Sequence, residues 1–141
     1  ILIPESILQK PAPLTKQEYE TVKEHTIKGS QILHDSINLH PENDTLMTIY
    51  EVIRHHHENY DGTGYPDGLS GLQIPLSARI VKVADVFDAL TSDRYYRKAY
   101  SPQEALQMMK INMQNHFDPM IFEIFVEHYK FFFSFASGKR Q

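Results

Sequence analysis

The sequence contains no cysteine and no tryptophan, and glycine is scarce, with six among 141 residues. The absence of cysteine excludes a disulfide scaffold, a cysteine nucleophile and any thiolate metal site. A bound metal ion would therefore need nitrogen and oxygen ligands. The length predicts one domain that spans residues 1–141.

The chain also lacks a positive net charge and a long apolar run. Its formal charge of −4 argues against a protein dedicated to duplex nucleic acid, although local cations could still meet a phosphate-bearing ligand. The most apolar stretch, residues 117–136, is interrupted by Asp118, Glu123, Glu127 and Lys130, so no membrane span is expected. Residues 1–10 do not resemble a signal peptide, which predicts a cytoplasmic protein.

Apolar periodicity and helix-capping signals predict an all-α fold. Capping boxes begin at Thr15 and at Ser101, and helices are expected from residue 15 to about 35, from 44 to 57, from 76 to 90, and onward from 101 and 118. The prolines before residue 15 predict an extended or turn-like start. The expected buried positions are Tyr19, Val22, Ile32 and Leu33 in the first helix; Leu46, Ile49, Tyr50 and Ile53 in the second; and Leu76, Ile80, Val83, Ala84 and Phe87 in the third.

Residues 58–74 interrupt this helical pattern with four of the six glycines. A long loop inside a compact domain is more often functional than accidental. Three consecutive histidines stand just before it, at positions 55–57. They could be a solvent-exposed tract, but His57 continues the buried stripe of the second helix, and a buried imidazole needs a partner.

A metal site is one interpretation of these histidines. Neighbouring histidines at a helix end can serve two adjacent metal ions, or one ion where the helix frays. His25 in the first helix gains significance only if it meets His56 and His57. Asp85 and Asp88 interrupt an apolar part of the third helix, and spacing does not choose between them. Imidazoles with one carboxylate suit Fe, Mn or Zn in hydrolysis, whereas calcium and magnesium prefer oxygen ligands.

A cluster of cations follows the third helix, at residues 93–98. Arg94 and Arg97 have the geometry that suits phosphate oxygens, and the tyrosines between them can stack on bases. The alternative is a solvated surface turn. Arg79, on the third helix itself, is interpreted as structural.

One long block resembles the HD-GYP domain family. It consists of His56-His57-Glu58, Asp61-Gly62 and Gly64-Tyr65-Pro66, and continues through Ala84-Asp85-Val86-Phe87-Asp88-Ala89-Leu90 to Asp93-Arg94. Ile3-Pro4, His25 with Gly29, and Phe117-Asp118-Pro119 extend the likeness over nearly the whole chain.

The resemblance implies a helical, metal-dependent phosphodiesterase that hydrolyses the bacterial second messenger cyclic di-GMP. It implies two or three divalent metal ions, iron or manganese first, with zinc or nickel as alternatives. By position it makes His25, His56, His57 and Asp85 metal ligands and Tyr65, Arg94 and Arg97 substrate-binding residues. The resemblance thus selects Asp85 over Asp88 as the metal ligand. Asp88 is then expected to support the ligands without binding the metal itself.

The chain also departs from the family pattern. The family's His-Asp pair with Ile-Gly-Lys would precede Ile1, and His34-Asp35 is rejected as a substitute because no Gly-Lys follows it. Asn59 and Tyr95 stand where many members have arginine and proline. We therefore expect a domain that lacks its first helices, is impaired as a fragment, and belongs to a larger protein with an N-terminal sensor or receiver domain.

Other functions fit the same pattern. The domain could be a non-catalytic receptor for cyclic di-GMP, or a protein-interaction module that uses its aromatic C-terminal helix. A homodimer is a further expectation.

Overall fold

The computed structural model describes residues 3–40, 42–93 and 97–136, with side chains up to residue 131. The helices are α1 (Glu5–Leu8), α2 (Lys16–Leu39), α3 (Asp44–His55), α4 (Leu76–Thr91), α5 (Pro102–Asn112) and α6 (Pro119–Ala136), with short 3₁₀ helices η1 (Gly71–Gln73) and η2 (Gln114–His116). These ranges contain no β-strand, so the predicted all-α fold is confirmed. None of the described helices is long and apolar enough to cross a membrane.

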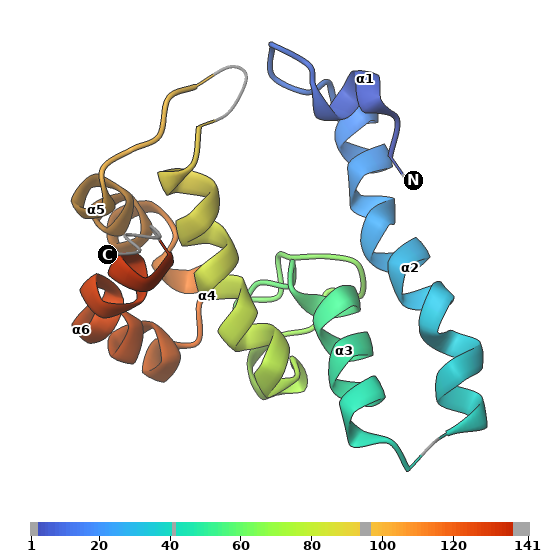
Figure 1. The fold of residues 1–141 in the computed structure, drawn as a ribbon. Coiled ribbons are helices and arrows are strands. Elements are labelled where there is room, and N and C mark those ends of the chain that lie inside the picture. Colours follow the sequence, from blue (N-terminus) through green and yellow to red (C-terminus); the bar gives the residue numbers. More distant parts are fainter. Residues whose placement is uncertain (1–2, 41, 94–96, 137–141) are drawn as a thin grey trace.

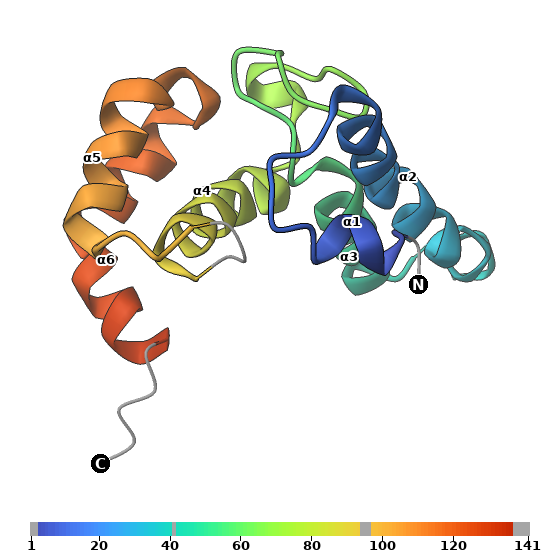
Figure 2. The ribbon, with the colours of Figure 1, turned by 90° about the horizontal axis from the view of Figure 1, so that it is seen from above.

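Helix α4 lies at the centre of the fold (Figure 1). It contacts α3 on one side and α5 and α6 on the other, while α2 packs along α3. Seen from above, α1, α2 and α3 lie together at the opposite end of the molecule from α5 and α6 (Figure 2). The loop between α3 and α4 therefore sits where the two halves of the fold meet.

The capping signals place the helix starts correctly. Thr15 and Ser101 both form complete capping boxes, in which side chains satisfy the free backbone amides of the first turn. Three boundaries differ from expectation. Residues 5–8 form a short helix within the segment expected to be extended or turn-like, α2 continues to Leu39, and α3 ends at His55, two residues before His57.

The buried face of α2 differs in part from the one that apolar periodicity predicts, because Val22 and Leu33 are only half-buried. Ile32 is 68% exposed, whereas Thr26 and Ser30 are buried. Both hydroxyls donate to carbonyl oxygens one turn back, at 2.9 and 2.8 Å, so burial leaves no unpaired donor. A Cβ on Gly29 would lie 2.8 Å from Ile53 Cγ2. Small residues thus allow α2 and α3 to approach closely, which brings His25 toward the end of α3.

Replacing Gly29 with valine should destabilise the fold and separate α2 from α3. Overpacking a tight helix contact typically costs about 1–3 kcal/mol. Urea unfolding of the intact protein measures this loss, with Ser36→Val on the exposed side of α2 as the control for the β-branched side chain. Equal stability of the two variants would show that the close approach is not needed.

The main core joins α4, α5 and α6. Val83 and Phe87 are buried as predicted, but Leu76 and Ile80 are 57% and 50% exposed. Arg79 Nη1 donates to Asp118 Oδ2 at 2.6 Å and ties α4 to the start of α6, which confirms its structural role. The other buried core members are Ala105, Leu106, Met109, Phe117 and Tyr129.

Candidate metal centre and adjoining pocket

The structure brings together three histidines from two distant parts of the chain. His25 comes from α2, His56 is the C-cap of α3 and His57 follows it. One ring nitrogen of each lies within 4.8 Å of the others. The Nε2 atoms of His25 and His56 are 3.5 Å apart. Two imidazoles bound to one metal ion at about 2.1 Å would place their nitrogens roughly 3.0–3.4 Å apart, so this spacing fits a shared cation.

The outer ring nitrogens of this pair face backbone carbonyl groups. His25 Nδ1 lies 2.6 Å from the carbonyl oxygen of Val22, and His56 Nδ1 lies 2.8 Å from that of Val52. Because a carbonyl oxygen only accepts, the Nδ1–H groups donate, and neutral rings then carry lone pairs on Nε2. Two lone pairs facing each other favour a cation between them, and such carbonyl contacts commonly orient metal-binding histidines.

His57 reaches the cluster through a turn, because α3 has already ended. The predicted continuation of the helical stripe to His57 is therefore wrong, although the side chain still points inward. Burial, with smaller contributions from His56, Lys82 and His25, lowers the pKa of His57 to about 3. The ring is consequently neutral near pH 7, which is the form that binds metal ions.

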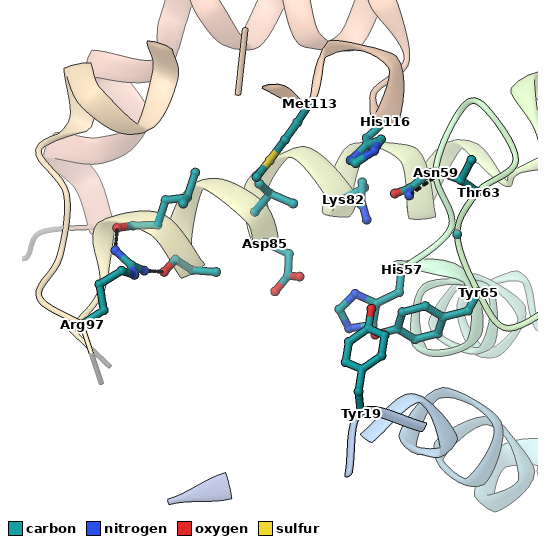
Figure 3. Close-up of a pocket in the computed structure, with 14 residues that line it drawn as sticks. Tyr19, His57, Asn59, Thr63, Tyr65, Lys82, Asp85, Arg97, Met113 and His116 are labelled. Carbon is teal, nitrogen blue, oxygen red and sulfur yellow. Dashed lines mark hydrogen bonds between the residues drawn. The ribbon is translucent and has the colours of Figure 1, made fainter. Parts of the chain in front are cut away.

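Asp85 lies in the same pocket as His57, whereas Asp88 does not. Asp85 on α4 lines the pocket together with His57 and Tyr65 (Figure 3). Within the described part of the chain, its carboxylate has no hydrogen-bond or salt-bridge partner. Asp88 is exposed, and its carboxylate accepts a long, 3.5 Å hydrogen bond from Ser92. Asp88 therefore does not line the pocket, while a partly buried, unpaired Asp85 suits a metal ion.

The pocket itself has a volume of about 620 Å³ and an aromatic wall formed by Tyr19 and Tyr65. Tyr65 stacks on His57 with ring centroids 4.9 Å apart, and Tyr19 meets Tyr65 edge-on at 6.2 Å. Tyr19 was expected in the core of α2, but it is 47% exposed and faces the pocket. Asn59, already noted as a departure from the family pattern, also lines the pocket, whereas sequence reasoning missed Thr63, Lys82, Met113 and His116.

Of the two arginines predicted to bind phosphate, only Arg97 lies within the described residues. Arg94 lies outside the described residues, as does Tyr95. Arg97 lines the pocket, but its Nη1 donates to the carbonyl oxygens of Leu90 and Lys98 and its Nη2 to that of Ala89, at 2.8–3.1 Å. These bonds satisfy carbonyls at the C-terminal end of α4, where a cation is favoured. Most of the guanidinium is therefore occupied by the backbone.

One buried carboxylate, that of Glu58, holds the glycine-rich loop of residues 58–74 in place. Glu58 is 1% exposed and accepts hydrogen bonds from the backbone amides of Asp67, Gly68 and Leu69, at 2.7–3.1 Å. A Cβ on Gly64 would collide with the backbone of Glu58 and Asn59. Only glycine therefore allows these two backbone segments to pass so close to each other. These contacts hold Tyr65 against His57.

A second group of metal-ligating residue types lies beside this loop. Nitrogen and oxygen atoms of His55, Glu58 and Asp67 fall within 4.8 Å of one another. Here the oxygens are already used: Glu58 holds three amides, and Asp67 forms a bidentate pair with Arg54 at 2.7 and 2.8 Å. Asp67 accordingly has a lowered pKa, chiefly because Arg54 donates to it. The group is a structural clamp on the loop.

The comparisons with known proteins agree with this architecture. A family model described as HD domain matches residues 1–121. A cyclic di-GMP phosphodiesterase of Pseudomonas aeruginosa, PA4108, is 42% identical over 89% of this chain and 28% of its own length. The 3'3'-cGAMP-specific phosphodiesterase 2 of Vibrio cholerae is 35% identical over 98% of this chain and 26% of its own.

A solved structure shares the fold. The HDG"Y"P protein Bd1817 of Bdellovibrio bacteriovorus superposes with a TM-score of 0.64 over 90% of this chain and 38% of its own, at 20% identity. The chain spans about a quarter to a third of the length of the curated relatives that it matches. With its family match and its histidine and Gly-Tyr-Pro block, the chain belongs to the HD domain family, as a member of the HD-GYP group.

Proposed function

We propose that the intact protein hydrolyses a phosphodiester bond of cyclic di-GMP in a metal-dependent reaction. The observation that carries this proposal is the meeting of His25, His56 and His57 at the edge of a pocket that also contains Asp85 and an aromatic wall. The relative PA4108, named a cyclic di-GMP phosphodiesterase, supports the substrate.

The proposed metal ligands are His25, His56, His57 and Asp85. Their nitrogen and oxygen donors favour iron or manganese, and two or more ions are proposed for the intact domain. A divalent ion supplies an activated water molecule at neutral pH and stabilises negative charge on phosphate oxygens. The protein contributes by fixing neutral imidazoles in place, as the backbone contacts of His25 and His56 do.

The aromatic wall is proposed to bind the base. Tyr65 and Tyr19 present ring faces and edges beside the histidines, and stacking on a nucleobase contributes about 1–3 kcal/mol per base. Burial raises the pKa of Tyr65 well above its usual range, so its phenol stays protonated and can donate a hydrogen bond. Arg94 stays a proposed phosphate contact, and Arg97 is proposed to position the segment after α4.

A second candidate substrate is 3'3'-cGAMP, since the relative from Vibrio cholerae named for that activity aligns with 98% of the chain. Both molecules are cyclic purine dinucleotides, so the aromatic wall suits either one.

The test is hydrolysis by the intact protein after anaerobic loading with Fe(II) or Mn(II). We expect conversion of cyclic di-GMP to linear products by chromatography, faster than conversion of 3'3'-cGAMP, and loss of this activity when a chelator removes the metal. Faster cleavage of 3'3'-cGAMP would reassign the substrate. Tight binding of cyclic di-GMP without turnover by the loaded protein would contradict an enzyme and favour the receptor alternative.

A further inference from the structure

Lys82 is a cation inside the pocket for which the protein provides no partner. Within the described residues, its ammonium group makes no hydrogen bond and no salt bridge within 4.0 Å. Asp85, Glu58 and Asp61 influence it only over longer distances. A partly buried ammonium group without a direct partner loses hydration and makes no hydrogen bond in return, so a bound anion would stabilise it.

The position of Lys82 fits an anion at the metal centre. Lys82 and Asp85 are three residues apart on α4, so they lie on the same side of the helix. Both project toward the part of the pocket that holds His57 and Tyr65 (Figure 3). A phosphate group between α4 and the histidines would face Lys82.

The other described cation of the pocket is less available. Arg97 uses both of its terminal nitrogens on backbone carbonyls and lies with its Cζ atom 4.5 Å from the centroid of the Tyr100 ring. In Figure 3 it stands at the far end of α4 from His57. Its charge is thus committed to the end of the helix, whereas that of Lys82 is free for a ligand.

We propose that Lys82 binds a phosphate oxygen of the substrate beside Asp85 and His57. The inference rests on the proposed function for the identity of the substrate, but the contact itself requires only a phosphate group. A lysine ammonium is a compact charge with three donors that suits this task.

The first test compares Lys82→Met, Lys82→Arg and the control Lys110→Met, an exposed lysine on α5. The manganese-loaded intact protein is titrated calorimetrically with cyclic di-GMP and, separately, with inorganic phosphate. We expect Lys82→Met to lower the affinity for both ligands by about tenfold or more, since a charge-assisted hydrogen bond is lost. Lys82→Arg should stay within about threefold of the parent, and Lys110→Met should match it.

The phosphate titration separates this inference from the proposed function. If the parent binds phosphate through Lys82 but does not bind cyclic di-GMP, the proposed substrate is wrong and the role of Lys82 stands. Unchanged phosphate affinity in Lys82→Met, at unchanged manganese content, would overturn the inference.

A second measurement uses only the parent protein. It therefore tests the inference even if the Lys82→Met protein folds poorly or binds too little metal. Acetylation of Lys82 and Lys110 is followed in the parent protein by mass spectrometry, with and without phosphate. Phosphate should slow acetylation at Lys82 by about threefold or more and leave Lys110 unchanged. Equal rates at Lys82 with and without saturating phosphate would contradict the assignment.

Discussion

Replacing His57 with alanine should abolish hydrolysis of cyclic di-GMP by the intact, metal-loaded protein. His57 stands at the junction of the site, because its ring lies with His25 and His56 and also stacks on Tyr65. Loss of a residue that only supports a metal ligand already lowers affinity or activity about 10–100-fold, so loss of a ligand should cost at least about 100-fold. Turnover and bound metal, measured together, test this expectation.

The matched control for this variant is His34→Ala on α2. The His34 side chain is 65% exposed and lies far along the helix from His25, so activity and metal content should equal those of the parent. Circular dichroism must show both variants folded. A His57→Ala protein that keeps parental turnover and parental metal content would remove His57 from the proposed ligands.

Replacing Glu58 with glutamine should destabilise the loop and the site that it carries. The substitution keeps the size of the side chain but turns one oxygen into a donor that faces backbone amides. Hydrogen bonds to a charged acceptor are worth about 1.5–3 kcal/mol each, so a loss of roughly 2–4 kcal/mol is expected. Urea unfolding measures this loss, and limited proteolysis between residues 59 and 70 reports on the loop.

The control for Glu58→Gln is Glu123→Gln, an exposed glutamate on α6. Its stability and proteolysis pattern should match the parent. Because Glu58 holds the segment just after Tyr65, the Glu58→Gln protein should also bind cyclic di-GMP more weakly. Parental stability in Glu58→Gln would mean that the three amide contacts contribute little to the fold.

Local rules explain which features could be predicted. The capping boxes at Thr15 and Ser101 depend on residues three apart, so the sequence reveals them directly. The buried face of α2 depends on its neighbour instead. Gly29, Thr26 and Ser30 face α3 because only small side chains allow the close approach at Ile53, and apolar periodicity therefore did not identify them.

The sequence alone determined the chemistry that is available to this protein. Without cysteine, a metal ion bound by this chain needs nitrogen and oxygen ligands, and the Gly-Tyr-Pro block indicated the family. The tertiary structure decided which groups meet and which are already occupied. Helical periodicity fixes angles only within one helix. It therefore could not predict that His25 meets His56, that Arg97 binds the carbonyl end of α4, or that Lys82 has no partner among the described residues of the pocket.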